Sequence, residues 1–300
     1  MEKTYSPTKI RSHQERPMVG MLSAIGAFFF FSVMNMFAKL LAPYHSVTEI
    51  GFYRNLIGFM PFLILMMIKG RQSIRLTNPK GVLLRAFLGT ASLLITFAAF
   101  IAMPMADVTA FLFTTSLLIP VLSVIILKEH VGLPRWSAVV IGFIGVLIMV
   151  QPTGAVNVLG VCLALGAASM HAFMGILLRY LGRTESPFAA TYYFMLVGLV
   201  LTGLMMPFIG SWPDPDHYWM IAGIGLSGAI AQFCLATAFK NAQAVVVTIF
   251  SYSSIIWATV IGFLVWEDWP NQAIFIGGFI VISCNLFILF REQRIKNNLP

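Results

Sequence analysis

Few residues of this chain can carry charge-based chemistry, and several of them lie inside long apolar stretches. Lys39, Arg54 and Arg85 each fall within a window of about 20 mostly apolar residues, and His171 is the only histidine near the middle of such a window. A cation in hydrocarbon costs about 2.5–3.5 kcal/mol on insertion scales, so each of these groups needs water, a partner or a function. No Asp or Glu lies near the middle of a window.

Ten apolar windows are predicted to be membrane-spanning helices. About 20 residues at 1.5 Å per residue cross the roughly 30 Å of hydrocarbon in a bilayer. The windows cover residues 18–41, 48–68, 81–102, 106–127, 133–151, 156–180, 187–209, 217–239, 243–266 and 271–290. The expected fold class is therefore an all-α integral membrane protein with ten transmembrane helices.

The positions of Lys and Arg predict the orientation of these helices. All Lys and Arg outside the windows lie in the two tails or at alternate connections, and the connections on the opposite side, such as residues 42–48 and 210–218, have none. The positive-inside rule then places both termini in the cytoplasm. We expect a multi-pass membrane protein.

Composition excludes several classes of protein. Hydrophobic residues make up 59% of the chain and charged residues 10%, so a soluble globular domain is not expected. The net charge of +8 is spread over separate cytoplasmic segments, and no nucleic-acid partner is predicted. The chain has no P-loop, HExxH or GxSxG motif, and no connection is long enough for a soluble catalytic domain. Its three cysteines lie within windows without metal-ligand spacing, so no enzyme activity, cofactor or metal is expected.

The chain also contains an internal repeat. Residues 26–39 align with residues 166–179 at an offset of 140, which also pairs Tyr53 with Tyr193; at an offset of 138, Glu129 aligns with Glu267. Five windows form one unit, and because five is odd the second unit crosses the membrane in the opposite sense. The predicted organisation is a tail (1–17), two inverted five-helix repeats (18–152 and 153–290) and a second tail (291–300).

Several motifs resemble the drug/metabolite transporter superfamily, in particular its ten-span bacterial branch with two EamA-type repeats. The resemblance rests on Phe52-Tyr53-Arg54, on Leu84-Arg85-Ala86, and on the run from residue 106 to residue 152. Within that run the typical positions are Ala106, Pro120, Leu127, Glu129, Arg135, Trp136, Gly142, Gly145 and Pro152. The second half departs from the pattern, because Ala258 stands where the first half has Pro120.

The resemblance implies a secondary carrier of the bacterial inner membrane for a small organic metabolite, with a central cavity lined mainly by windows 1, 3, 4, 6, 8 and 9. The arginines suggest an anionic substrate group, and the many aromatic residues suggest an apolar or aromatic portion. An amino acid or an amino-acid derivative has both features, and uptake of S-adenosylmethionine is one possibility within this branch. The sequence is compatible with both import and export.

No window has a carboxylate near its middle, where proton-coupled carriers usually have one. Transport is therefore either coupled through His171 or the outer acids, or it is uncoupled diffusion or exchange. The other partners expected are membrane lipids, and the protein is expected to be a monomer or homodimer.

The alternative functions are a flippase for lipid-linked substrates in the same superfamily, with a cavity open sideways to lipid, and an integral-membrane enzyme. The enzyme is disfavoured because clustered metal-binding acids are missing. A channel is disfavoured because no filter-like motif is present and an inverted repeat suits alternation better.

Candidate substrate-binding residues are polar or aromatic groups within the windows. Gln232 and the cluster at residues 251–254 are the hardest to satisfy by bonding to their own helix. The candidates are Asn35, Arg54, Asn55, Arg85, His171, Gln232, Ser251, Tyr252 and Trp257.

Three residues are candidates for gating. Pro120 interrupts the fourth window and is a possible hinge, and Lys39 and Asp107 lie at the predicted outer mouth. For Lys39 the alternative is that the side chain extends to the lipid headgroups. Arg54 is expected to pair with Glu49 or with Asp107.

Overall fold

The computed structural model describes residues 17–115, 117–118, 122, 133–150, 157–181, 185–241, 247 and 250–297. Every regular element in these ranges is a helix. The α-helices are α1 (Pro17–Leu41), α2 (Val47–Lys69), α3 (Pro79–Ala102), α4 (Met105–Leu112), α6 (Leu133–Val150), α7 (Val158–Leu181), α8 (Pro187–Gly203), α9 (Met206–Ile209), α10 (Tyr218–Asn241), α12 (Ser253–Trp266) and α13 (Gln272–Asn297). Two short 3-10 helices, η1 (Arg71–Ile74) and η2 (Pro215–His217), lie in connections.

The all-helical expectation is confirmed for the described residues, and each predicted window contains at least one helix. Among these residues, the helices at Met18–Leu41, Val47–Lys69, Pro79–Ala102 and Pro215–Ala238 are long and apolar enough to cross a membrane, and five further apolar helices are shorter. The count of ten spans stays a prediction. The second half of window 4, which contains Pro120, and the first part of window 9 lie largely outside the described residues.

Helix starts follow ordinary capping chemistry. Ser46 and Glu49 form a reciprocal capping box at the start of α2, which satisfies two backbone N–H groups that the first turn leaves open. The side chain of Asn78 accepts from the N–H of Gly81 at the start of α3. The α2 helix ends at Lys69 and is followed by the capping residue Gly70, which has φ of 80°, a conformation that glycine adopts without a Cβ clash. These caps set the bounds of the two arginine-bearing helices, α2 and α3.

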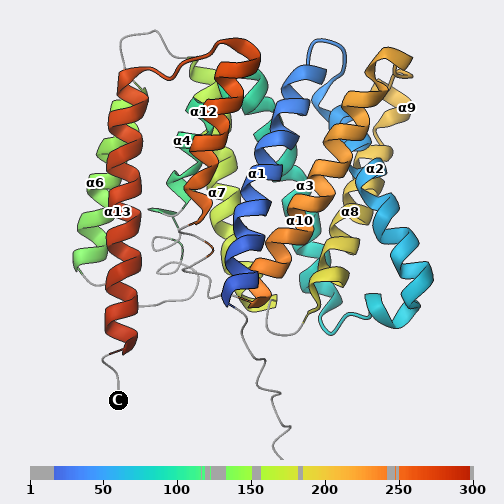
Figure 1. Ribbon diagram of the computed structural model, residues 1–300, viewed down its shortest axis with the longest axis horizontal. Helices are drawn as coiled ribbons and strands as arrows, with labels where there is room; N and C mark the ends of the chain where they lie inside the picture. The colour runs from blue at the N-terminus through green and yellow to red at the C-terminus, as the bar shows by residue number, and fades with distance from the viewer. Residues whose placement is uncertain are drawn as a thin grey trace, which may run out of the picture.

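Apart from the four-residue α9, the α-helices in the described ranges form two groups of four, joined by α1 and α7 (Figure 1). One group contains α2, α3, α8 and α10, and the other contains α4, α6, α12 and α13. The α1 helix packs against α10 in the first group and α12 in the second, whereas α7 packs against α3 in the first group and α4 in the second. The start of α1 and the end of α13 lie at the same end of the bundle (Figure 1).

The outer surface of the bundle is apolar. Large side chains such as Phe208, Leu264 and Phe279 are 87%, 72% and 72% exposed. A water-soluble protein rarely exposes apolar surface this extensively. The same surface is the expected one in lipid, where helices satisfy their own backbone hydrogen bonds.

Candidate functional site

Two of the predicted site residues, Arg54 on α2 and Arg85 on α3, lie together in the interior of the first group. Their exposed fractions are 0% and 5%. Both guanidinium carbons lie over the ring of Phe194 on α8, at 5.2 and 5.7 Å from its centroid. Such cation–π contacts are worth about 2 kcal/mol when the cation is desolvated. Phe194 is therefore the centre of a cationic cluster that brings α2, α3 and α8 together.

The cluster has few hydrogen bonds. The Nη1 group of Arg54 donates to Asn55 Oδ1 at 2.7 Å and to the sulfur of Met195 at 3.2 Å. The Nη1 group of Arg85 donates to the backbone carbonyl of Ala190 at 3.2 Å. Asn55, another predicted site residue, thus belongs to the same cluster.

The expected pairing of Arg54 with Glu49 or Asp107 is wrong. Within the described residues, no carboxylate forms an ion pair with either guanidinium. Glu49 accepts instead from the N–H groups of Ser46 and Ser211, each at 2.7 Å. The reason is helical periodicity: five residues along a helix turn the side chain by about 140°, so Glu49 and Arg54 lie on different faces of α2.

Glycines allow α2 and α8 to approach closely. The contacts are reciprocal: a glycine of each helix faces a larger side chain of the other helix. A Cβ added at Gly198 would lie 2.6 Å from the Nδ2 atom of Asn55, and one added at Gly58 would lie 3.3 Å from the sulfur of Met195. The repeat offset of 140 pairs Gly58 with Gly198 and also pairs Asn55 with Met195. The offset therefore converts the contact of Gly58 with Met195 into the contact of Gly198 with Asn55.

The neighbouring helices repeat this exchange. A Cβ at Gly89 on α3 would lie 2.6 Å from the ring of Phe194, and a Cβ at Gly228 on α10 would lie 2.8 Å from Nε of Arg54. Arg54 and Phe194 are again related by the offset of 140, and the two glycines by an offset of 139. Sequence reasoning missed Phe194 and Met195, although the repeat offset aligns them with Arg54 and Asn55.

A second cluster joins α1 to the end of α12. Lys39 Nζ lies 3.1 Å from Asp268 Oδ2 and 4.6 Å from the centroid of the Trp266 ring. Asp107 on α4 lies within electrostatic reach of both Lys39 and Asp268. Lys39 is therefore held in an ion pair and does not extend freely to the headgroups. The two predicted gating residues, Lys39 and Asp107, therefore lie near the same end of the bundle, and the ion pair of Lys39 is with Asp268.

Aromatic pairs lie on the helices of the second group and on α1. The rings of Phe29 and Trp257 are 5.1 Å apart, as are those of Phe113 and Tyr252, and both pairs are edge to face. Phe113 and Tyr252 are each in a turn that interrupts helical structure. Ser251, also predicted for the site, directly precedes Tyr252 and is half-buried.

Three other predicted residues join neither the arginine cluster nor the aromatic pairs through a hydrogen bond among the described residues. Asn35, His171 and Gln232 are half-buried on α1, α7 and α10. The Oδ1 atom of Asn35 and the Nε1 atom of Trp257 are buried without a hydrogen-bond partner in the described part of the chain. The structure thus divides the predicted substrate site into separate clusters. Pro120, the predicted hinge, lies outside the described residues.

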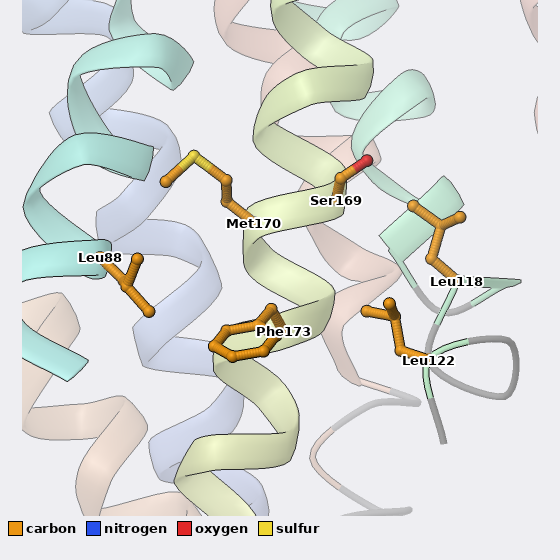
Figure 2. Close-up of a pocket in the computed structure, with 6 residues that line it drawn as sticks. All are labelled: Leu88, Leu118, Leu122, Ser169, Met170 and Phe173. Carbon is orange, nitrogen blue, oxygen red and sulfur yellow. The ribbon is translucent and has the colours of Figure 1, made fainter. Parts of the chain in front are cut away.

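A cavity of about 350 Å³ lies against α7, between α3 and the residues that follow α4 (Figure 2). It is lined by Leu88, Leu118, Leu122, Ser169, Met170 and Phe173. The only hydroxyl of this lining, that of Ser169, donates to the carbonyl of Leu165 at 2.9 Å. The cavity is therefore apolar, and its lining includes none of the predicted site residues.

Comparison with known proteins identifies the family. The model of the EamA-like transporter family matches residues 18–151 and again residues 158–290. The chain belongs to the EamA-like transporter family. As a member of this family and of the drug/metabolite transporter superfamily, it is a membrane transporter and not an enzyme, as its sequence predicted.

Relatives of this EamA-like transporter carry different substrates. The chain is 27% identical to the riboflavin transporter of Vibrio cholerae, covering 94% of this chain and 97% of the relative. It is 24% identical to the S-adenosylmethionine uptake transporter of Rickettsia conorii, covering 89% and 90%. It is 26% identical to the pseudopaline exporter CntI of Pseudomonas aeruginosa, covering 88% and 94%. These names support a small-molecule substrate.

The fold of this EamA-like transporter also matches a solved structure. A protein of known crystal structure superposes with a TM-score of 0.65 over 93% of this chain and 98% of that one, at 16% identity. At this identity the match concerns the fold alone.

Proposed function

We propose that this protein is a secondary transporter of the bacterial inner membrane that moves a small organic metabolite by alternating access, with both termini in the cytoplasm. The observation that carries the proposal is the exchange of contacts between α2 and α8, in which Gly58 faces Met195 and Gly198 faces Asn55. Two inverted repeats related by a pseudo-twofold axis in the membrane plane produce such exchanged contacts. They also give two similar conformations that open to opposite faces.

Helix packing supports the same symmetry. The contact of α1 with α10 corresponds to that of α7 with α3, and the contact of α1 with α12 corresponds to that of α7 with α4. The separate family matches to residues 18–151 and 158–290 support a division at about residue 152. In this proposal α1 and α7 are the equivalent helices that transmit movement between the two groups.

The corresponding helices α1 and α7 have different contacts, as expected for an alternating carrier that is closed on one side and open on the other. Phe29 on α1 packs against Trp257, and Lys39 on the same helix pairs with Asp268. Ser169, which corresponds to Phe29 at the offset of 140, lines the apolar cavity instead. We infer that the α1–α12 end is closed in this state, with Lys39, Asp107 and Asp268 forming its gate.

For the substrate we propose an amino acid or an amino-acid derivative. The S-adenosylmethionine carriers among the relatives support this class, and the buried arginines supply a partner for a carboxylate. The aromatic pairs Phe29–Trp257 and Phe113–Tyr252 offer surfaces for an apolar or ring-bearing portion.

Cross-linking the gate tests alternating access. Lys39→Cys and Asp268→Cys are combined in a protein whose native cysteines, Cys162, Cys234 and Cys284, are replaced by alanine. The protein is reconstituted in liposomes and treated with a short cleavable thiol cross-linker. A labelled pool of amino acids, N-acyl amino acids and S-adenosylmethionine is offered, and transport of whichever members the protein carries should stop on cross-linking and recover on cleavage.

A matched control uses a contact within one helix group. Thr77 and Glu185 precede α3 and α8, and the N–H of Thr77 donates to the Glu185 carboxylate at 3.0 Å. Cross-linked Thr77→Cys/Glu185→Cys should continue to transport, because both helices belong to the same group. Unchanged transport by the cross-linked gate pair would contradict alternating access at this gate.

A lipid flippase is the second candidate, favoured by the position of the cavity. Its lining comes from α3, α7 and the residues after α4, and two lining residues, Ser169 and Phe173, are exposed. For a flippase, a fluorescent lipid should cross reconstituted liposomes, and Leu118→Trp, which fills the cavity, should stop it. Leu147→Trp, on the exposed face of α6, is the control. Absence of lipid movement with the parent protein would dismiss the flippase.

A further inference from the structure

We propose that the arginine cluster around Phe194, formed by Arg54 and Arg85, binds the carboxylate of an organic anion, so that among amino-acid derivatives the preferred substrate lacks a free ammonium group and carries a net negative charge. The proposal rests on the proposed transport function and specifies its substrate class. It starts from the charge balance within the first helix group. Two cations that are 0% and 5% exposed share one phenyl ring, and no carboxylate of the described residues is paired with either.

Three acidic side chains of the described residues are engaged by other groups, and no described carboxylate is paired with either arginine. Glu49 is bound by Ser46 and Ser211, and Asp268 by Lys39. Glu185 accepts from the N–H groups of Thr77 and Asn78, close to the start of α3. An unpaired charge in an apolar interior strongly destabilises the folded protein. A bound anion would remove this penalty, and the protein itself supplies no equivalent anion here among the described residues.

The arginines also hold unused hydrogen-bond donors. Nε and Nη2 of Arg54 and Nε of Arg85 are buried without an acceptor in the part of the chain that the structure describes. A guanidinium presents its N–H groups in a planar fork that matches the two oxygens of a carboxylate. Gly228 on α10 lies beside Nε of Arg54, so Nη2 is the donor of Arg54 that is left for a carboxylate. The Nη1 bonds to Asn55 and Met195 would hold the guanidinium in place.

Flexible side chains from the two bridging helices border the cluster. Met34 on α1 lies beside Gly228, the residue that faces Arg54, and Met174 on α7 lies beside Gly89, the residue that faces Phe194. Met34 and Met174 correspond to each other at the repeat offset of 140. Methionine has three rotatable bonds and adapts to different neighbours. Movement of α1 or α7 would uncover the cluster from the middle of the bundle, which connects the site to the proposed transport cycle.

The surroundings of the cluster discriminate by charge. A zwitterionic amino acid or a cation would bring an ammonium group, for which the described residues offer no carboxylate paired with the arginines. The Phe194 ring is already in contact with both guanidiniums. The site therefore favours a monoanion or dianion with an aromatic or apolar body over a zwitterion of the same size.

A matched series of probes tests this preference. We would measure the binding of 3-phenylpropanoate, phenylalanine, 2-phenylethylamine and 3-phenylpropanol to the purified protein by calorimetry and thermal shift. These probes share a phenyl ring and differ mainly in charge. The anion should bind at least tenfold more tightly than the other three. Equal or tighter binding of phenylalanine or of the amine, or no binding of any probe, would overturn the proposal.

Variants assign the preference to the arginines. Arg54→Gln and Arg85→Gln should each reduce the affinity for 3-phenylpropanoate at least tenfold and leave that for 3-phenylpropanol unchanged. Both should keep or raise the melting temperature of the free protein, because each removes an uncompensated buried charge. Arg75→Gln, at an exposed position after η1, is the control and should bind like the parent. Variants that fold and still prefer the anion would exclude the arginine site.

The two proposals fail separately. If the gate cross-link stops transport of a substrate that carries no negative charge, alternating access stands and the anion site is lost. If the anion binds through Arg54 and Arg85 but its flux does not respond to the gate cross-link, the site stands and the proposed gate is lost.

Discussion

Arg54 on α2 and Phe194 on α8 occupy corresponding positions of the two halves, at the repeat offset of 140, and contact each other directly. The guanidinium carbon lies 5.2 Å from the centroid of the ring. In the proposed pair of inverted repeats, corresponding residues can meet only close to the axis that relates the repeats, so this contact would mark where the two repeats join. Identical repeats would bring two like side chains together there, whereas this chain pairs a cation with an aromatic ring.

Replacing Phe194 by leucine should destabilise the protein by about 2–3 kcal/mol, because the substitution removes two cation–π contacts and leaves a small cavity. Unfolding in mixed micelles would measure the change. Phe188→Leu is the matched control, since its ring contacts a single cation, the ammonium group of Lys69 at 5.4 Å, among the described residues, and it should cost about 1 kcal/mol. Equal effects of the two substitutions would argue against a special role for Phe194.

Gly198→Ala should disrupt the hydrogen bond between Arg54 and Asn55. The new methyl group would lie 2.6 Å from Asn55 Nδ2, so the amide must move, at a cost of about 1–3 kcal/mol. Gly166→Ala on α7 meets nothing within 4 Å among the described residues and should be neutral or stabilising by up to about 1 kcal/mol. Thermal unfolding of the two variants gives the comparison, and similar melting temperatures would contradict the close approach of α2 and α8.

Lys39→Met should weaken the closed state of the gate. An ion pair of this exposure contributes about 1 kcal/mol, which corresponds to about a fivefold change in the ratio of two conformations. A cysteine introduced by Trp257→Cys in the cysteine-free protein should then react faster with a thiol reagent that does not cross the membrane. The exchanged pair Lys39→Asp/Asp268→Lys should restore the slow rate. Failure of the exchange to restore it would indicate that Lys39 acts through something other than Asp268.

Glu49→Gln should loosen the connection between α9 and η2. The carboxylate accepts from the N–H of Ser211 at 2.7 Å and from its hydroxyl at 2.8 Å, and charge-assisted bonds contribute about 1.5–3 kcal/mol each. Hydrogen exchange at the Ser211 amide should therefore accelerate by at least tenfold. Glu185→Gln at the opposite end is the control and should leave exchange at Ser211 unchanged.

Hydropathy was sufficient to predict an all-helical membrane protein, and the resemblance of its motifs identified the right transporter family. These signals are local or additive along the chain, because a helix that must bury its backbone in lipid needs only a run of apolar residues. The offset of 140 that pairs Tyr53 with Tyr193 also pairs Arg54 with Phe194. The sequence therefore determined the apolar windows that form helices, and the repeat offset predicts which positions correspond between the two proposed repeats.

Only the tertiary structure decided which side chains meet. An apolar helix is apolar on nearly every face, so its periodicity does not indicate which neighbour a buried polar group will contact. For this reason Arg54 is directed to Phe194 and Asn55 and not to Glu49, and Lys39 is paired with Asp268, a residue 229 positions away. The same packing separates the arginine cluster from the aromatic pairs, which the sequence had placed in a single site.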